Sequence, residues 1–247
     1  MIEFFKTQNP DIITIQEILR HLDDSVFENY KFQEKIEKAI IKTYPYKFFG
    51  SLWVTDKFKK DGVVYREYGG QVEQGNEIMS KFPIVEATNE FYYKNFSYNL
   101  DVTNWHIEDH GRAVQVVELN VENKRLKILN VHGIWTRDKL GDKRTIAECK
   151  YIIEVAMRNS DVPTIIVGDF NLLPETKSIS ILNRQFKNLI EAYQIKSTRP
   201  NFEDDKDNGN EVVDYIFVND RIKVNNFSAI DIDISDHLPL VLDFEII

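Results

Sequence analysis

Short apolar runs rich in valine and isoleucine alternate along the whole chain with longer segments in which apolar residues recur at helical spacing. The apolar runs have turn-like flanks, and this combination favours strands over buried helices. They predict strands at residues 11–15, 113–121, 126–131, 164–167, 213–218 and 240–246. The helical spacing predicts helices at residues 1–7, 27–43, 143–159 and 177–189.

Two of these predicted helices carry a single apolar stripe, which is typical of a helix that packs on a core. The stripes consist of Phe32, Ile36, Ala39 and Ile40 in the first helix and of Ile146, Cys149, Ile153 and Ala156 in the second. Strands mixed with helices indicate a layered α/β or α+β domain. The chain has no internal repeat and no linker rich in proline, glycine or serine, so we expect one domain, residues 1–247.

Two aromatic-rich stretches, residues 51–75 and 89–110, are predicted to be long excursions from the domain. Their aromatic residues could stack on exposed bases or insert into lipid; packing onto the domain is the interpretation that we favour. The polar, acidic run at residues 203–211 is predicted to be a solvated surface loop. The aromatic residues of the two stretches are Trp53, Tyr65, Tyr68, Phe91, Tyr92, Tyr93 and Trp105.

The charge balance is acidic, with 40 Asp and Glu residues against 31 Lys and Arg residues and a formal net charge of -9. A protein that binds nucleic acid mainly by non-specific phosphate attraction is usually basic. A polyanionic substrate would therefore have to be held locally, by a metal ion or by a small basic patch.

The one cysteine, Cys149, excludes an intramolecular disulfide and a multi-cysteine zinc site, and its helical neighbours indicate a buried structural thiol. No apolar run approaches the length that spans a bilayer. The first residues lack the basic region and the apolar stretch of a signal peptide. We therefore expect a cytoplasmic protein without stable membrane association.

Polar residues with catalytic potential follow or open the predicted strands. They form five clusters, Gln16–Glu17, His132, Asp169 with Asn171, Asp214, and Asp236–His237. In a mixed sheet the start of one strand can lie beside the end of its antiparallel neighbour, so these clusters could meet at one edge. Their oxygen donors suit magnesium or manganese, whereas zinc would need more histidine or cysteine ligands.

Each cluster also has an ordinary structural interpretation. Glu17 could be a solvated strand end, Asp169 could cap a turn, and His237 could be a buried histidine with its hydrogen bonds satisfied. Asp214 is harder to explain in this way, because a carboxylate inside an apolar strand needs a partner. The order and placement of the whole set carries the prediction.

At these residues the sequence resembles the endonuclease/exonuclease/phosphatase superfamily, which includes DNase I-like nucleases, sphingomyelinases and inositol polyphosphate 5-phosphatases. The resemblance covers nearly the whole chain in the family's order, and together its motifs are highly specific. It implies an α/β fold, a four-layer sandwich of two mixed β-sheets flanked by helices. The matching segments are residues 10–17 (PDIITIQE), 75–84 (GNEIMSKFPI), 130–133 (NVHG), 168–171 (GDFN), 214–217 (DYIF) and 235–239 (SDHLP).

The resemblance also implies roles for individual residues. Glu17 would bind a catalytic Mg²⁺, with Mn²⁺ as the alternative, and Asp236 would contribute to metal binding. Asp169 and Asn171 would position and polarise the attacking water.

The remaining implied roles concern the phosphate. His237 would contact the scissile phosphate as a base or as a charge stabiliser, and Asp214 would orient its imidazole. His132 would hydrogen-bond the phosphate and assist the leaving group. Arg112 matches the family's arginine near the substrate phosphate, although an exposed surface arginine is an equally good interpretation.

One feature departs from the family. Its members open with a strand that carries an asparagine in a Thr-x-Asn phrase, whereas this chain begins with the predicted helix 1–7. We expect that strand to be missing through truncation or a misassigned start, with natural loss as the alternative. Its absence would leave a neighbouring strand unpaired and would put both activity and localisation in question.

Three functions follow. The favoured one is a metal-dependent phosphodiesterase or nuclease acting on nucleic acid or nucleotides by in-line attack of water. The alternatives are a hydrolase of another phosphoester, such as a sphingolipid headgroup or an inositol phosphate, and a non-catalytic binding domain. A nucleic-acid substrate would require basic residues around the cleft. The chain has two groups of basic residues that could serve, although each could also be an ordinary solvated surface. The sequence does not identify the substrate or the oligomeric state. The candidates are Arg137, Lys139, Lys143, Arg144, Lys57, Lys59 and Lys60.

Overall fold

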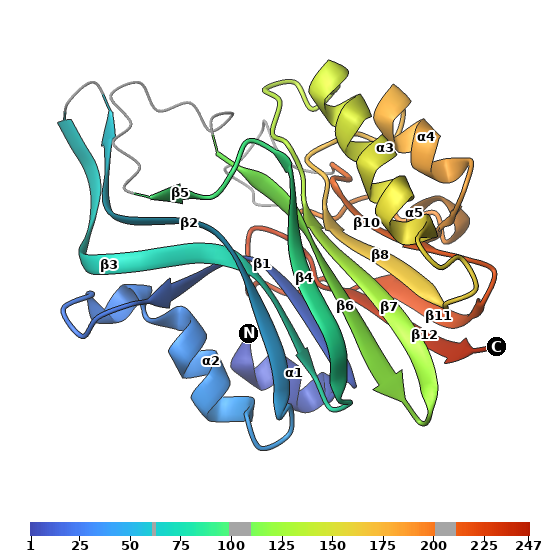
Figure 1. Ribbon diagram of the computed structural model, residues 1–247, viewed down its shortest axis with the longest axis horizontal. Helices are drawn as coiled ribbons and strands as arrows, with labels where there is room; N and C mark the ends of the chain where they lie inside the picture. The colour runs from blue at the N-terminus through green and yellow to red at the C-terminus, as the bar shows by residue number, and fades with distance from the viewer. Residues whose placement is uncertain (61–62, 99–109, 201–210) are drawn as a thin grey trace.

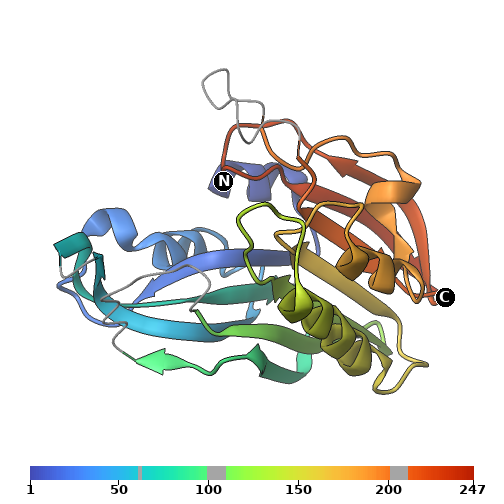
Figure 2. The same cartoon turned by 90° about the horizontal axis from the view of Figure 1, so that it is seen from above.

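The computed structural model describes residues 1–60, 63–98, 110–200 and 211–247. Two β-sheets pack face to face, with helices on both outer sides, as Figure 1 and the view from above in Figure 2 show. This arrangement confirms the predicted α/β sandwich of two mixed sheets.

The six-stranded sheet has the strand order β4-β6-β7-β8-β10-β9. β6 runs antiparallel to β7, β7 parallel to β8, and β8 antiparallel to β10. The central strands are buried on both faces, as their near-continuous apolar runs require. The strands are β4 (Ile84–Tyr93), β6 (Arg112–Val121), β7 (Lys124–His132), β8 (Thr164–Asp169), β9 (Lys187–Asn188) and β10 (Asp214–Val218).

The second layer consists of a four-stranded sheet, ordered β1-β3-β2-β5, and a separate two-stranded sheet, β11-β12. The long antiparallel pair of β2 and β3 dominates the four-stranded sheet, and β5 joins β2 in parallel. These strands are β1 (Ile12–His21), β2 (Tyr46–Lys60), β3 (Val63–Ser80), β5 (Ser97–Tyr98), β11 (Ile222–Ala229) and β12 (Leu240–Ile246).

Helices α3 (Lys143–Met157), α4 (Lys177–Asn183) and α5 (Leu189–Ala192) lie against the outer side of the six-stranded sheet (Figure 1). α3 begins at a capping box, in which Asp142 accepts from the backbone and Thr145 accepts from the backbone of Asp142. At its other end the buried Lys127 of β7 donates to the carbonyls of Ala156 and Arg158. A cation at the helix C-terminus satisfies free carbonyls and complements the helix dipole.

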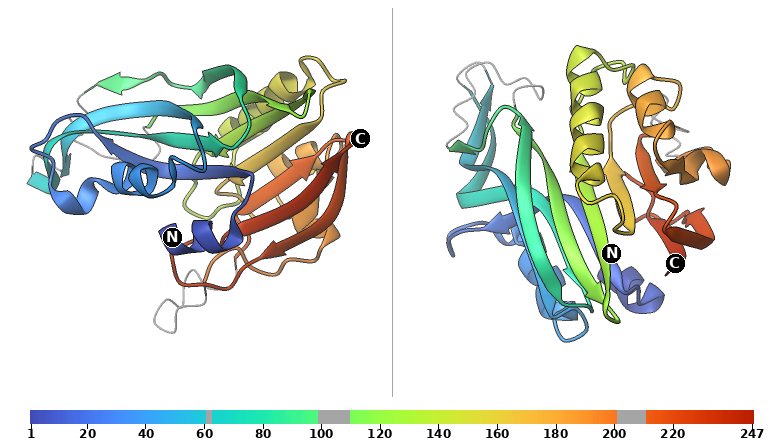
Figure 3. Two further views of the ribbon diagram at one scale, coloured as in Figure 1. Left: turned by 90° about the horizontal axis from the view of Figure 1, so that it is seen from below. Right: turned by 45° about the vertical axis from the view of Figure 1, so that its right-hand side comes forward.

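Helices α1 (Ile2–Gln8) and α2 (Phe32–Ile40) lie on the side of the four-stranded sheet (Figure 3), and the short 3-10 turn η1 (Glu28–Tyr30) leads into α2. Ile36 and Ile40 of α2 pack with Ile13 and Ile18 of β1 in a cluster of their own. The predicted helix 27–43 is therefore right in place but too long at both ends.

A cavity of about 1340 Å³ separates β1 from β12 on the inner side of the six-stranded sheet. Among the described residues, β1 pairs only with β3 and β12 only with β11. α1 contributes Phe4 and Phe5 to the wall, and the apolar floor includes Ile128 and Ile165. One end of this cavity holds the polar residues of the candidate site.

The expected excursions at residues 51–75 and 89–110 are wrong where the structure describes them. Residues 51–60 and 63–75 belong to β2 and β3, and the second stretch begins inside β4 and includes β5. Trp53 and Tyr68 are buried, as the packing interpretation predicts, whereas Tyr65 is 70% exposed. Trp105 and most of the acidic run 203–211 lie outside the described residues.

Two other predicted elements differ in extent. The predicted helix 177–189 is two short helices, α4 and α5, separated by β9, and Asn188 caps the second through its side chain. The predicted strand 11–15 continues to His21. Within the described residues, no helix is long and apolar enough to span a membrane.

Candidate active site

Strand register aligns three of the predicted site residues in one row. His132, the last residue of β7, is opposite Asp169, the last residue of β8, in the parallel pairing. Asp214, the first residue of β10, is opposite Asp169 in the antiparallel pairing. Gly168 permits this close approach, because its φ is 144° and a Cβ there would lie 1.9 Å from the carbonyl oxygen of Val131. The expectation that strand ends and strand starts meet at one edge therefore describes this row.

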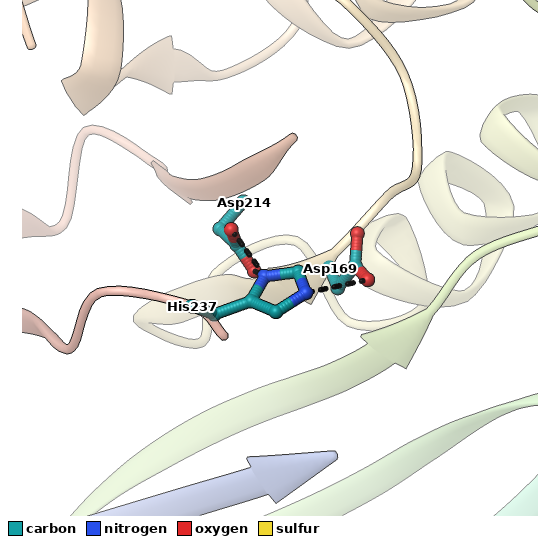
Figure 4. Close-up of side chains that lie close together, drawn as sticks. All are labelled: Asp169, Asp214 and His237. Carbon is teal, nitrogen blue, oxygen red and sulfur yellow. Dashed lines mark hydrogen bonds and ion pairs between the residues drawn. The ribbon is translucent and has the colours of Figure 1, made fainter. Parts of the chain in front are cut away.

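Asp214 holds His237 by its Nδ1 (Figure 4), at 3.0 and 2.8 Å from the two carboxylate oxygens. The Nδ1–H of His237 donates to this carboxylate. The other ring nitrogen, Nε2, therefore faces Asp169 and lies 3.8 Å from its Oδ2. Burial alone would lower the pKa of His237, but the hydrogen bond and the charge of Asp214, with the charge of Asp169, raise it to about 9. At neutral pH this imidazole is therefore protonated.

The backbone after β8 fixes Asp169 and Asn171. Asp169 Oδ1 accepts from the backbone N–H of Asn171 at 2.7 Å, and Asn171 has a left-handed φ of 54°. The Asn171 amide donates to the carbonyl of Gly133 at 3.3 Å. Burial, and then the charge of Asp214, raise the pKa of Asp169 to about 7. The turn presents both side chains to the end of the cavity that they line.

His132 has different surroundings. The buried Arg112 donates from Nη1 to Nδ1 of His132 at 3.1 Å, and Nε2 of His132 lies 3.2 Å from Glu17 Oε1. Arginine is only a donor, so Nδ1 accepts and the proton of the neutral ring is on Nε2. Burial, and then the charges of Arg112 and His237, hold the pKa of His132 well below its ordinary value. Arg112 is thus buried in the site, and its interpretation as a surface arginine is wrong.

Glu17 reaches the site from the other sheet by means of a β-bulge. Ile15 pairs with Glu77 and Ile18 with Gly75, so Gln16 and Glu17 face one residue of β3. Glu17 has φ 55°, a left-handed conformation that costs a residue with a side chain about 1 kcal/mol. Its carboxylate is 58% exposed and lies in contact with His132.

A second group of buried polar residues lies behind His132. Tyr92 donates its hydroxyl to Glu148 Oε1 at 2.6 Å, and Glu148 Oε2 accepts from the backbone N–H of Ile134 at 3.2 Å. The Tyr92 hydroxyl oxygen is also 3.2 Å from the carbonyl oxygen of His132. Burial raises the pKa of Glu148 to about 7. These contacts hold the segment that follows β7 without touching the cavity.

Asp236 lies at the open side of the site, with its side chain 75% exposed. Its Oδ2 is 3.9 Å from His237 Nε2 and 3.7 Å from Nη1 of Arg199. The same cavity is lined by Trp135 and by all the predicted site residues, Glu17, Arg112, His132, Asp169, Asn171, Asp214, Asp236 and His237. The fold therefore brings all the site residues predicted from the sequence to the same cavity.

The donor set suits a hard divalent cation. Asp169, Asp214 and His237 each offer a ligand atom within 4.8 Å of the others, although the Asp214 hydrogen bond occupies His237 Nδ1. Glu17 and Asp236 add two exposed carboxylates to the same cavity. Several carboxylates around one space repel one another, and a bound cation would relieve that repulsion. The residues present therefore fit a magnesium-type ion.

Sequence reasoning missed Arg199, Trp135, Tyr92 and Glu148. Trp135 was adjacent to the His132 motif, so proximity could have suggested it, whereas nothing in the spacing marks Arg199 or Glu148. Of the basic candidates, Lys139 pairs with Glu211 and Arg144 with Asp142.

The comparisons with known proteins concern the family and the fold. The model of the endonuclease/exonuclease/phosphatase family matches residues 1–237. An endonuclease/exonuclease/phosphatase from Beutenbergia cavernae has a TM-score of 0.72 at 13% identity, covering 99% of this chain and 65% of that protein. The chain therefore spans less than two thirds of that relative. The sequence has no significant match among curated proteins.

Two further solved structures have a similar fold. A mannosyl-6-phosphatase from Bacteroides thetaiotaomicron has a TM-score of 0.67 at 16% identity, covering 99% of this chain and 88% of that protein. D. rerio TDP2 in complex with a single-strand DNA product has a TM-score of 0.65 at 12% identity, covering 98% and 89%. At these identities the likeness concerns the fold.

Proposed function

This chain belongs to the endonuclease/exonuclease/phosphatase family, and we propose that it is a divalent-metal-dependent phosphoester hydrolase. The observation that carries the proposal is the Asp214–His237–Asp169 arrangement, in which one imidazole lies between two buried carboxylates at the end of a cavity. A structural role alone does not call for this combination, because burying two acids beside each other is costly.

Glu17 and Asp236 would hold the cation, with Asp169 near them. The cation, Mg²⁺ or alternatively Mn²⁺, would supply charge neutralisation at the phosphate oxygens. The chain's own residues perform the remaining steps. Asp169 and the Asn171 amide orient a water for in-line attack, since the turn fixes both side chains beside the cavity.

His237 and His132 act on the phosphate in different ways. The protonated His237 donates Nε2–H to a non-bridging oxygen and stabilises the charge that develops there, while Asp214 fixes the ring. The neutral His132 presents its Nε2–H on the Glu17 side, and Arg112 fixes its tautomer. With Arg112 as a permanent charge beside it, His132 hydrogen-bonds the phosphate and assists the departing oxygen.

The substrate class that we favour is a phosphodiester of nucleic acid or of nucleotides. The DNA-bound TDP2 structure supports this choice, since its fold holds a single-strand DNA product. Another phosphoester is the second candidate, because the mannosyl-6-phosphatase has the same fold. A binding domain without catalysis is the third, and the presence of seven expected site residues argues against it, namely Glu17, His132, Asp169, Asn171, Asp214, Asp236 and His237. The cytoplasmic location stays a prediction.

The test is hydrolysis of bis-p-nitrophenyl phosphate, single-stranded oligonucleotides and mannose 6-phosphate with Mg²⁺, Mn²⁺ or EDTA. We expect turnover that requires the metal and disappears in His237→Ala. His21→Ala is the matched control, because His21 contacts Glu34 away from the site. Turnover in EDTA, or equal activity of the two variants, would refute the proposed chemistry. Manganese binding followed by electron paramagnetic resonance checks the ion separately from activity.

A further inference from the structure

Arg199 lies in a backbone segment that is hydrogen-bonded to two parts of the candidate site, the strand that begins at Asp214 and the segment that carries His237. Thr198, its neighbour, accepts from Val213 N and Asp214 N through Oγ1, at 3.0 and 3.2 Å. The Thr198 carbonyl accepts from the backbone N–H of Leu238 at 2.7 Å. Arg199 therefore follows a residue that is tied both to the Asp214 strand and to the segment carrying His237.

Ser197 fixes the other side of Arg199. Its hydroxyl donates to the Arg199 carbonyl at 2.7 Å and accepts from the Arg199 backbone N–H at 3.1 Å. A side chain on such a restrained segment loses little backbone freedom when it binds a ligand, and this preorganisation favours binding.

The Nε of the Arg199 guanidinium is a buried donor without an acceptor among the described residues. The side chain as a whole is 17% exposed and lines the cavity. Its ion pair is with Asp236. Because Asp236 is mostly exposed and the two groups are 3.7 Å apart, this ion pair contributes little, so the positive charge of Arg199 is available to a ligand.

The position of this charge relative to His237 indicates what it would bind. Arg199 Nη1 and His237 Nε2 lie 3.7 and 3.9 Å from the same oxygen, Oδ2 of Asp236. The two cationic groups are therefore close enough to contact oxygens of one phosphate or of two adjacent phosphates. Arg112 also lines the cavity, where it donates to His132. The cavity is therefore lined by three positively charged groups, Arg112, Arg199 and the protonated His237.

We propose that Arg199 is a specificity-determining residue that binds a second negative charge of the substrate, beyond the single charge of an isolated phosphodiester. The inference rests on the proposed hydrolase function and narrows its substrate. The second charge has two sources with the same chemistry, the dianion of a terminal phosphate or the neighbouring phosphate of a nucleotide chain. An arginine fork suits either, because it donates two parallel hydrogen bonds to anionic oxygens.

The test compares substrates with one and two negative charges in wild type and Arg199→Gln. Bis-p-nitrophenyl phosphate supplies one charge, and p-nitrophenyl phosphate supplies two on one phosphorus. The p-nitrophenyl ester of thymidine 5′-phosphate, with or without a 3′-phosphate, tests the neighbouring phosphate. Intrinsic reactivity cancels, because each substrate is compared between the two proteins.

We expect Arg199→Gln to lower kcat/KM about 10- to 100-fold for at least one doubly charged substrate and less than about 3-fold for the singly charged ones. The affected substrate identifies the source of the second charge. Arg199→Lys should restore part of the loss, since it keeps the charge without the fork. Arg221→Gln is the matched control, because Arg221 is an exposed arginine that contacts Asp161. An equal loss on every substrate, or none on any, overturns the proposal.

A binding measurement separates this proposal from the proposed hydrolase function. Dissociation constants of phenyl phosphate and diphenyl phosphate are measured at pH 8 in EDTA, without any turnover. Wild type should bind phenyl phosphate more tightly than diphenyl phosphate if the second charge is on the same phosphate. If the second charge is a neighbouring phosphate, wild type should bind thymidine 3′,5′-bisphosphate more tightly than thymidine 5′-monophosphate. Arg199→Gln should lose whichever preference wild type shows. If wild type lacks activity but shows this preference, the hydrolase function fails and the anion site stands. If the preference is the same in both proteins, the anion site fails.

Discussion

The two histidines of the site have opposite surroundings. His132 ends a central strand, is nearly inaccessible, and accepts a hydrogen bond from Arg112. His237 lies on the segment before β12, is 24% exposed, and donates to Asp214. The pKa of His132 is held well below its ordinary value, mainly by burial, whereas the pKa of His237 is raised to about 9 by its carboxylate neighbours in spite of burial.

This contrast shows how one residue type obtains two roles. The position in the sequence determines only that each imidazole lies at or near the end of a strand. The charge of the partner that the fold places beside it decides whether the ring is neutral or cationic at pH 7. Changing one histidine or its partner is therefore the direct way to test the division of roles.

The largest expected effect is on catalysis at the cationic histidine. His237→Ala should lower kcat about 10³- to 10⁴-fold, because it removes the group that stabilises charge on the phosphate. Asp214→Asn should lower kcat by a similar factor, since it removes the charge that keeps the ring protonated and oriented. Steady-state kinetics with unchanged circular dichroism would check this, and a double variant no worse than either single variant would show that the pair acts as a unit. Separate, multiplicative losses would contradict the pairing.

The next effect is on stability and distinguishes the histidines by the sign of their pH dependence. His237 has a folded pKa above its unfolded value, so its contribution is complete below about pH 6.5 and is lost as pH rises through about 9. The full contribution is about 3 kcal/mol. His132 has a folded pKa below its unfolded value, so its protonation in the unfolded state lowers stability as pH falls below about 6.5.

Urea unfolding in EDTA between pH 5 and 9.5 measures both contributions. The stability difference between wild type and His237→Gln should shrink with rising pH, and that between wild type and His132→Gln should shrink with falling pH. Parallel curves for the two variants would show that the two histidines do not differ in protonation.

A smaller loss is expected at the partner of the neutral histidine. Arg112→Gln should lower kcat/KM about 100-fold, because it removes a buried positive charge near the phosphate. It should also raise the pKa of His132, since Arg112 is one of the causes of the depression. NMR titration of the His132 ring measures that pKa. A fall of the pKa, or no change, would mean that Arg112 does not keep the ring neutral.

The smallest expected change in unfolding free energy concerns the backbone at Glu17, whose carboxylate faces Nε2 of His132. Glu17→Gly should lower activity but raise the free energy of unfolding by about 0.5 kcal/mol, because glycine adopts a positive φ without the side-chain penalty. Glu17→Ala removes the same carboxylate without relieving the backbone and serves as the matched control. Urea unfolding of both variants separates the backbone effect from loss of the charge. Equal stability of the two would show that φ carries no cost here.

The sequence predicted the four central strands of the six-stranded sheet, β6, β7, β8 and β10, because buried strands are continuous apolar runs, but it did not predict β4 or β9. It also predicted that the separate clusters containing Asp169, Asp214 and His237 could meet at one edge, since polar groups at the ends of such strands have few structural reasons to be there. The hairpin of β2 and β3 was misread as an excursion. Its outer part is exposed and charged, so local composition resembled a loop although the backbone is paired.

The rest of the site depends on contacts between distant residues. Glu148 lies on α3 and meets Tyr92 of β4, 56 positions away. Arg199 belongs to an irregular segment whose placement depends on hydrogen bonds to β10 and to Leu238. Neither contact leaves a periodic or local mark in the sequence, so only the folded chain places Arg199 at the site and Glu148 behind it.

The extra residue in β1 has a consequence for how the chain can evolve. Ile13 and Ile18 are five positions apart, so an unbroken strand would turn them to opposite faces, yet both pack against α2. The bulge restores the parity between them while it turns Glu17 to the site. Deleting or inserting one residue here would invert every later side chain of the strand. Relatives should therefore keep the number of residues between these two isoleucines, so aligned sequences should show substitutions there without gaps.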